Sequence, residues 1–412
     1  MTGDQSLLKR INRMALVRLV KAEAGLSRVD LASRTGLTKT TVGVLVQELI
    51  EEGWLYQDEP AEGQGAGRRP LPLMLDRDRI GLIGAEIGVD YLNVVACNLW
   101  GEPLHKKCIP YAHRDVTRSL RTLVSMLASA YGELSDRGRW VLGIGVGVPG
   151  TIDIRDGMLR SAPNIGWHEV GIEPLLTAGL AEAGSVELPI TISNDAKAAA
   201  LSEYVFGTDH HSGPLVYLAI GIGLGSGVVV SDGLYLGHDG IAGEVGHTIL
   251  ERGGPLCACG RRGCAETFIS QRAVSRELTG KDNPVLTIET IQKALAAGDK
   301  AALRATRKSG EYLGVLLQNV ANTYNPAVIV LGGPLVQLGE PFIKAALSSM
   351  EAHAGQYDYH RHSVRVCRFG IDACALGAAA GVLQRALHSV ATDLGAAPKR
   401  ARRQRRQSRG GA

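Results

Sequence analysis

The chain has 412 residues, of which 45% are apolar and 21% charged, and its net charge is +4; this length predicts two or three domains. The longest apolar runs, such as "VYLAI" and "AVIVL", are too short to cross a bilayer, and the first residues lack the apolar segment of a signal peptide. We therefore expect a cytoplasmic protein with no membrane contact, in which clustered cysteines are metal ligands or redox groups rather than structural disulfides.

The first sixty residues have the pattern of short helices. Ser27 and Asp30 form an approximate capping box, Gly36 ends that helix, and Thr38 can cap the next one. In this second helix, four apolar residues form one stripe: Val42, Leu45, Val46 and Leu49. The residues expected to face DNA lie mostly off the stripe: Thr38, Lys39, Thr40, Gly43 and Gln47. A small helical bundle for packing or dimerisation is the alternative, but residues 1–39 carry eight basic and only three acidic side chains, which favours a helix-turn-helix.

The segment "GWLYQDEPAEGQGAGRRPLPLML" follows, with the pattern of a strand, a flexible tip and a returning strand. Such a hairpin after a helix-turn-helix is typical of the wing of a winged helix. Arg68 and Arg69, between Gly67 and Pro70, could enter the minor groove of DNA as extended-arm arginines do.

From Ile80 to about Leu387, apolar strands alternate with glycine turns and amphipathic helices, which predicts an α/β architecture. Two units of strand and glycine resemble each other, "IGLIGAEIGVD" and "LVYLAIGIGLGSGVVV". A fold with two lobes built from related halves would produce this recurrence.

Three of the seven cysteines lie within "CACGRRGC", at residues 257–264. Cys257, Cys259 and Cys264 supply three of the four ligands of a tetrahedral zinc site, and His247 is the nearest histidine upstream. A disulfide would leave one cysteine unpaired in a reducing compartment. Four protein ligands would close the coordination shell, so the expected Zn²⁺ is structural rather than catalytic.

A winged helix that ends in "GRRP" and precedes an α/β body resembles the repressor branch of the ROK family (repressors, open reading frames, kinases), over nearly the whole chain up to about residue 390. The stretch "GEVGH…CACGRRGCAE" is similar to the zinc signature of that family. The resemblance implies a winged helix-turn-helix followed by a two-lobed, actin-like (sugar-kinase-like, ribonuclease H-like) body. It also implies that the zinc loop directs Glu244, His247 and Glu266 into a sugar pocket.

Two further stretches match the sugar side of the family. "SNDAKAAALSEYVFG" resembles the motif of the catalytic aspartate, so Asn194 and Asp195 would bind sugar hydroxyls, and Asp195 would be the general base in a kinase. The second asparagine of the motif is Lys197 here. "SAPNIGWHEV" resembles the substrate loop and adds Asn164. Taken alone, the Asn-Asp pair could also be a helix cap that binds no ligand.

The loops that hold phosphate in the family's kinases are altered. The pattern Asp-x-Gly-Gly-Thr is "EIGVD" here, with Glu86, Val89 and Asp90 at the changed positions, and Ile222 replaces the threonine of the second loop. A branched side chain would block the approach of phosphate, and a carboxylate would repel it. The chain is therefore predicted to be a sugar-responsive repressor rather than an ATP-dependent sugar kinase. A DNA-binding scaffold without a ligand would not need the sugar residues.

The predicted boundaries are a winged helix at 1–75, a first lobe at 79–196 completed by a helix at about 374–390, a second lobe with the zinc loop at 197–373, and a basic tail at 393–412. The expected partners are operator DNA, a sugar or sugar derivative, and further copies of the chain in a homodimer or homotetramer on a palindromic operator. Seven basic residues and no acidic ones lie between Lys399 and Arg409. This tail is interpreted either as a solvated, disordered end or as a nucleic-acid contact.

Overall fold

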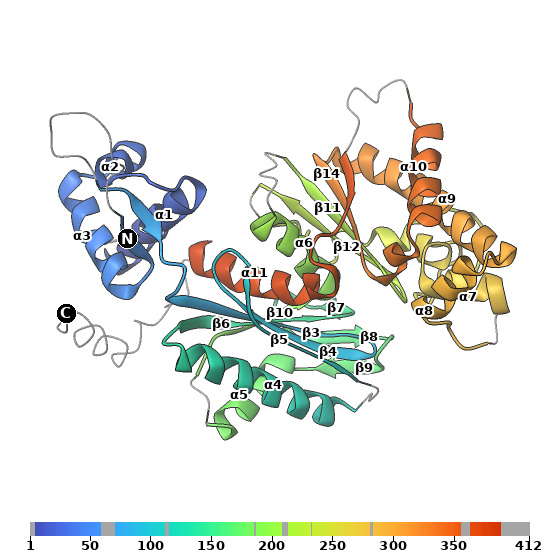
Figure 1. Ribbon diagram of the computed structural model, residues 1–412, viewed down its shortest axis with the longest axis horizontal. Coiled ribbons are helices and arrows are strands. Elements are labelled where there is room, and N and C mark those ends of the chain that lie inside the picture. The colour runs from blue at the N-terminus through green and yellow to red at the C-terminus, as the bar shows by residue number, and fades with distance from the viewer. Residues whose placement is uncertain are drawn as a thin grey trace.

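A computed structural model describes residues 5–58, 71–111, 115–184, 187–207, 213–231, 233–280, 283–355 and 363–388. It has three parts, a small N-terminal domain and two α/β lobes, as predicted (Figure 1). The predicted wing arginines Arg68 and Arg69 and the basic tail lie outside the described residues. Among the helices of the described residues, none has the length and apolar character needed to span a membrane.

The N-terminal domain contains three helices and a two-stranded antiparallel sheet: α1 (Gln5–Ala22), α2 (Arg28–Thr35), α3 (Lys39–Glu52), β1 (Leu55–Gln57) and β2 (Leu73–Leu75). The predicted capping box is present, because the Ser27 and Asp30 side chains each accept the other residue's backbone N–H. Gly36 ends α2 with φ of +72°, a left-handed conformation that favours glycine. The apolar stripe of α3 is fully buried in this domain.

The first lobe is a five-stranded sheet in the order β10-β6-β3-β4-β5, with a three-stranded sheet, β7-β8-β9, beside it. Its strands are β3 (Ile80–Ile87), β4 (Tyr91–Cys97), β5 (Pro103–Pro110), β6 (Trp140–Val148), β7 (Thr151–Ile152), β8 (Leu159–Ala162), β9 (Trp167–Val170) and β10 (Ile190–Asn194). Its helices α4 (Val116–Asp136) and α5 (Ile172–Glu182) pack on the outer face of the sheet.

The second lobe is a five-stranded sheet in the order β13-β12-β11-β14-β15. Its strands are β11 (Leu215–Ile220), β12 (Leu224–Val230), β13 (Gly233–Leu234), β14 (Val328–Gly332) and β15 (Ser363–Val366). Its helices are α7 (Gln271–Thr279), α8 (Ile288–Ala296), α9 (Lys300–Tyr324) and α10 (Glu340–Ala352), with short 3₁₀ turns η1 (Val245–His247), η2 (Ala265–Thr267), η3 (Pro334–Leu338) and η4 (Gly370–Asp372).

The two five-stranded sheets have the same internal order. In each sheet, the first three strands in sequence are antiparallel neighbours. Two later strands are added on the other side of the first strand, and both pair in parallel. The recurrence of strand and glycine in the sequence thus comes from equivalent first strands, β3 and β11, and the prediction of related halves is confirmed.

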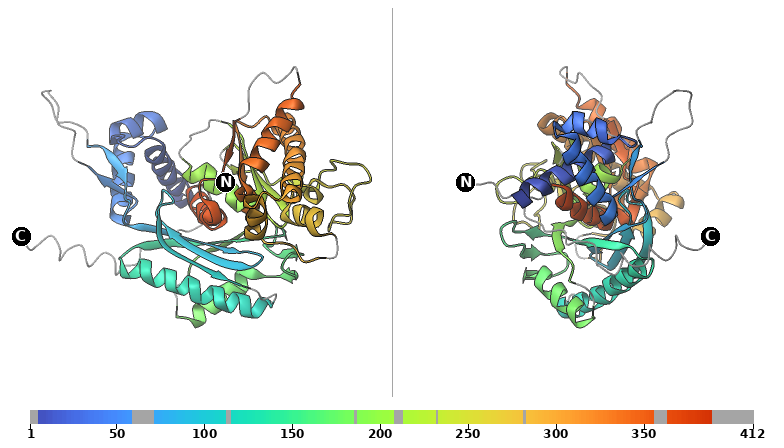
Figure 2. Two further views of the ribbon diagram at one scale, coloured as in Figure 1. Left: turned by 45° about the vertical axis from the view of Figure 1, so that its right-hand side comes forward. Right: turned by 90° about the vertical axis from the view of Figure 1, so that its left-hand side faces the viewer.

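Two helices, α6 (Asp195–Phe206) and α11 (Ala373–His388), lie between the two sheets and cross each other closely (Figures 1 and 2). Small residues permit this crossing, because a Cβ at Gly377 of α11 would overlap the carbonyl oxygen of Ala198 in α6. A Cβ at Gly145 of β6 would likewise overlap the backbone of Ala378. Helix α11 therefore contacts the first sheet and α6 at the same time.

The N-terminal domain packs on this central helix. The Arg18 guanidinium of α1 donates to the carbonyl oxygen of Leu387 in the last turn of α11, at 2.6 Å. The indole of Trp54 meets that of Trp140, at the start of β6, edge to face with ring centroids 6.1 Å apart. One continuous hydrophobic core joins the N-terminal domain, α11 and both lobes.

Candidate functional site

The exposed face of α3 contains the residues predicted to contact DNA. Thr38, Lys39, Thr40 and Gln47 are exposed, and Gly43 is half-buried with no other atom near the position of a Cβ. Val44 lies on the same face, 53% exposed, and sequence reasoning missed it because it is apolar. An exposed valine beside polar residues could contact a thymine methyl group in the major groove.

The four residues predicted as metal ligands come together. One donor atom from each of His247, Cys257, Cys259 and Cys264 lies within 4.8 Å of the others. The Cys259 and Cys264 sulfurs are 3.6 Å apart, and Nδ1 of His247 is 3.7 Å from the Cys257 sulfur. One nitrogen and three sulfurs at this separation fit a tetrahedral metal ion.

The local backbone explains how a short segment forms this cluster. Gly260 and Gly263 have φ of +85° and +77°, so the chain turns sharply between the cysteines. The backbone N–H of Cys257 donates to the carbonyl oxygen of Arg261, which closes the loop. Burial raises the pKa of the Cys259 thiol, but hydrogen bonds with Arg261, Cys257 and Cys264 together outweigh burial and lower this pKa to about 6. A thiolate, the form that binds metal, is thus favoured there.

Two predicted sugar residues from different lobes meet beside the metal cluster. A Cβ built on Gly223 would lie 2.6 Å from Oε2 of Glu266 and 3.6 Å from Nδ2 of Asn164, so both side chains border the same glycine loop. Glu266 accepts the backbone N–H of Leu224 at 3.1 Å, and its other oxygen is 3.7 Å from the Cys257 sulfur. The metal loop and the second glycine loop are therefore joined through Glu266.

Asn194, Asp195 and Glu244 form a second group near the start of α6. Asn194 caps α6 through the N–H of Lys197, and its amide donates to the carbonyl oxygen of Gly150. The cap foreseen for the Asn-Asp pair is thus present. Burial raises the pKa of Asp195, backbone hydrogen bonding from Ala196 opposes this, and the negative charge of Glu244 raises it further.

Lys197 replaces an asparagine of the family motif, and the structure shows what it contacts. Its ammonium donates to the carbonyl oxygen of Gly240 and lies 3.9 Å from Oε1 of Glu244. Burial lowers the pKa of Lys197, while Glu244 and Asp195 raise it. The lysine therefore fixes the loop before Glu244 from the start of α6.

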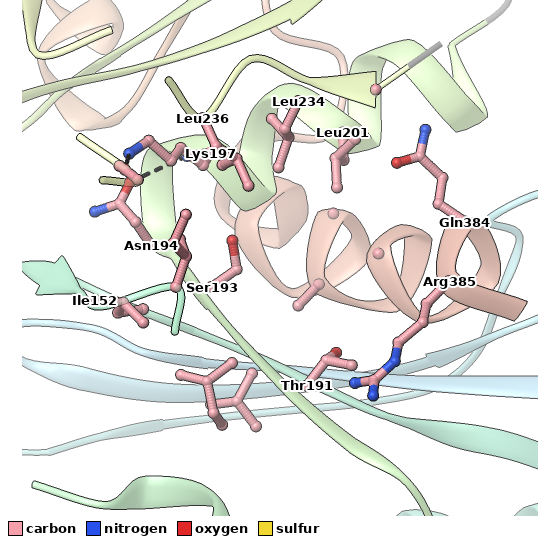
Figure 3. A pocket seen from close by; sticks show the side chains of 18 of the residues that line it. Ile152, Thr191, Ser193, Asn194, Lys197, Leu201, Leu234, Leu236, Gln384 and Arg385 are labelled. Carbon is pink, nitrogen blue, oxygen red and sulfur yellow. Dashed lines mark hydrogen bonds between the residues drawn. The ribbon is translucent and has the colours of Figure 1, made fainter. Parts of the chain in front are cut away.

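A pocket of about 420 Å³ lies between the lobes and is bordered by α6, β10 and α11 (Figure 3). Asn194 and Glu244 of the predicted sugar residues line it, together with Lys197. Asn164, Asp195, His247 and Glu266 are not among its lining residues. The predicted sugar residues thus lie in two neighbouring groups, which the turn from Glu244 to His247 connects.

The first altered phosphate loop is a tight turn between β3 and β4, in which the N–H of Gly88 donates to the carbonyl oxygen of Tyr91. The Tyr91 hydroxyl donates to Oε1 of the buried Glu86 at 2.6 Å. A Cβ on Gly88 would be 2.7 Å from the Tyr91 ring. An aromatic side chain and a buried carboxyl group, with Val89 exposed at the tip, thus lie at the turn that resembles the phosphate loop of the family's kinases.

Glu86 leads to a prediction about pH. Burial raises its pKa from 4.5 to about 8, the Tyr91 hydrogen bond opposes this, and Asp195, Asp372 and Asp90 raise it further. The folded chain thus keeps a proton that the unfolded chain has already lost, so this group makes the free energy of unfolding fall as the pH rises from about 4.5 to 8. Glu86→Gln should remove that fall.

Urea denaturation at pH 5 and pH 9 measures this effect. The Glu86→Gln variant should resemble the parent at pH 5 and be more stable by roughly a few kcal/mol at pH 9. Glu102→Gln, at an exposed position, is the matched control. An equal effect of Glu86→Gln at both pH values would contradict the assignment.

Comparisons with known proteins agree with this arrangement. The chain is 29% identical to a xylose repressor of Caldicellulosiruptor bescii, over 92% of this chain and 97% of that protein. A solved structure of a ROK family transcriptional regulator, a homologue of the E. coli MLC protein, superposes with a TM-score of 0.77 at 24% identity and covers 92% of this chain and 97% of its own. A ROK family glucokinase from Streptomyces griseus, solved with glucose and AMPPNP, gives a TM-score of 0.59 at 25% identity and covers 73% of this chain and 98% of its own.

Family profiles match both parts of the chain. The IclR helix-turn-helix domain matches residues 14–59, which include α2 and α3. The ROK family matches residues 82–385, which include nearly all of both lobes and most of α11. Since this match extends over well more than half of the sequence, the chain belongs to the ROK family.

Proposed function

We propose that the protein is a sugar-responsive transcriptional repressor that acts in the cytoplasm. The proposal rests on the combination, in one chain, of a helix α3 with exposed polar residues and a body that matches the sugar motifs of the family but departs from its phosphate-loop patterns. The sugar is expected to bind where Asn164 and Glu266 from opposite lobes border one loop, together with the neighbouring group of Asn194, Asp195, Glu244 and His247. Carboxylate and amide groups suit sugar hydroxyls, which need both donors and acceptors.

The DNA interface is assigned to α3 and the wing, including Arg68 and Arg69. The exposed side chains at the start of α3 would reach base edges in the major groove. A second copy of the chain would present a second α3 about one helical turn (~34 Å) away, so a homodimer or homotetramer on a palindromic operator is expected. The basic tail could add phosphate contacts that do not depend on sequence.

Selection from a pool of random double-stranded DNA tests this interface. The full chain should enrich one inverted repeat. Lys39→Ala should weaken binding to that repeat by about 1–3 kcal/mol and should weaken binding to random DNA less. A side chain that contacts a base contributes mainly to the specific complex. Lys300→Ala, on the remote helix α9, is the matched control. If Lys39→Ala loses the same binding free energy on both DNAs, Lys39 contacts the phosphate backbone instead of a base.

The Cys3His cluster is proposed to hold one structural zinc ion. Four nitrogen and sulfur donors within 4.8 Å suit the size and ligand preference of Zn²⁺. Four protein ligands would fill a tetrahedral shell and leave no coordination position for a reacting water. Bound zinc would fix the loop that carries Glu266. Because Nδ1 of His247 faces the cluster, its second ring nitrogen is left for a contact with the sugar.

Helix α11 is the proposed connection between sugar and DNA. It packs on α6 and the first sheet, while its last turn accepts a hydrogen bond from Arg18 of the N-terminal domain. A sugar that draws the lobes together would move α6 against α11 and so change the position of α3. A preference of a few kcal/mol for one arrangement of the lobes would be enough to change operator occupancy.

This connection predicts a separation of effects. In Arg18→Gln, the Kd for sugar alone and the Kd for operator alone should each stay within about threefold of the parent value. The factor by which sugar changes the operator Kd should fall toward one. Calorimetry with sugar and fluorescence anisotropy with operator measure the three quantities. Arg118→Gln, exposed on α4, is the control. A full response to sugar in Arg18→Gln would rule out this hydrogen bond as the connection.

A further inference from the structure

The pocket between the lobes has apolar walls from both of them. Leu201 of α6 and Leu234 and Leu236 of the second lobe face Ile152 of the first lobe across it (Figure 3). These walls are unlike the set of carboxylates and amides expected to hold a sugar. A ligand of this pocket therefore needs an apolar body, since burial of apolar surface would provide most of its affinity.

Two exposed isoleucines extend the apolar surface to the edge of the pocket. Ile154 of the first lobe is 46% exposed and Ile241 of the second is 54% exposed, and both line the pocket. A Cβ on Gly240 would be within 2.5 Å of the Ile154 side chain, so the two lobes touch at this edge. An apolar ligand would cover both isoleucines and bind the two lobes at once.

The end of the pocket at α11 is cationic. Arg385, an exposed residue of α11, extends toward Thr191 of β10 (Figure 3), and the exposed His388 of α11 also lines the pocket. The lining includes one carboxylate, Glu244, which lies beside Lys197 at the opposite end. No ion pair of Arg385 is found among the described residues. A guanidinium that has no carboxylate partner among the described residues, at one end of an apolar pocket, suits an anionic group on an apolar ligand.

From this arrangement we propose that the pocket holds a second effector, a small carboxylate with an aromatic or other apolar body, and that it adjoins the sugar site through Asn194 and Glu244. The carboxylate would pair with Arg385, and the body would lie between Leu201, Leu234 and Ile152. Arg385 and His388 flank Leu387, whose carbonyl oxygen accepts the hydrogen bond from Arg18. A ligand at Arg385 therefore contacts the same helical turn that is hydrogen-bonded to the N-terminal domain.

Calorimetry on the full chain tests the site with benzoate, 3-phenylpropionate and 4-phenylbutyrate, each paired with its uncharged amide. At least one carboxylate should bind with a Kd of about 1 mM or lower and about tenfold or more tightly than its amide, because a hydrogen-bonded charge pair is lost in the amide. Arg385→Gln should abolish that difference. Arg121→Gln, an exposed arginine of α4, should not.

A second variant fills the pocket without disturbing the fold. Gly381 lines the pocket in α11, and a Cβ there meets only a methyl group of Leu201, at 3.7 Å. Gly381→Leu should therefore fold normally, because leucine favours helix over glycine, and it should abolish binding of every probe. Asn164→Ala, at a predicted sugar residue that does not line the pocket, should leave the probes bound as in the parent, which separates binding of the probes from binding of sugar.

Three results would overturn the proposal. One is the absence of binding for all three carboxylates up to about 10 mM. Another is a carboxylate that binds no more tightly than its amide. The third is a Gly381→Leu variant, shown to be folded, that binds the probes as tightly as the parent.

Discussion

Protein purified without added metal is expected to contain about one zinc ion per chain, and Cys259→Ser should lose most of it. The serine hydroxyl is a far weaker zinc ligand than the Cys259 thiolate, so the loop that carries Glu266 would lose its anchor. We expect the free energy of unfolding to fall by several kcal/mol, because metal binding contributes directly to folding. Sugar binding should fall as well.

Plasma mass spectrometry and urea denaturation measure these changes. Cys108→Ser is the matched control, because Cys108 is a free, exposed cysteine on β5 outside the cluster. It should keep both the metal and the stability of the parent. Folded parent protein with no zinc would contradict the assignment.

Asp195→Asn should weaken sugar binding about tenfold to a hundredfold, because a hydrogen bond to a charged group contributes about 1.5–3 kcal/mol. The substitution keeps the shape of the side chain and removes its charge beside Glu244. Operator binding without sugar should be unchanged, since Asp195, at the start of α6, is not among the residues proposed to contact DNA.

Calorimetry against a panel of hexoses, pentoses and amino sugars provides the measurement. Asp299→Asn, at the exposed N-cap of α9, is the control for a change from aspartate to asparagine at the start of a helix. If Asp195→Asn binds sugar as tightly as the parent does, Asp195 is not a sugar residue.

The features that the sequence predicted well are local ones. The capping box at Ser27, the glycine turn at Gly36 and the stripe on α3 each depend on residues within a few positions, so spacing alone located the helices. The metal cluster also comes from a short segment, since the residues from His247 to Cys264 fold back on themselves.

The features that the sequence could not show are contacts between distant segments. Arg18 and Leu387 are 369 positions apart, and nothing in either neighbourhood indicates their hydrogen bond. The pocket at Arg385 combines residues of both lobes with the last turn of α11. Tyr91 beside Glu86 is close in sequence, but its contact depends on the direction of a buried side chain rather than on spacing.

The response of operator binding to sugar tests the central claim most directly. Fluorescence anisotropy with the selected inverted repeat, titrated in the presence of each sugar of the panel, gives the operator Kd with and without sugar. At least one sugar should change this Kd about tenfold or more, within the usual range of coupling between two sites, and Asp195→Asn should not respond at the same concentration. An operator Kd that no sugar changes, together with sugar-dependent release of ADP from ATP at about 1 s⁻¹ or faster, would identify a kinase and contradict the account.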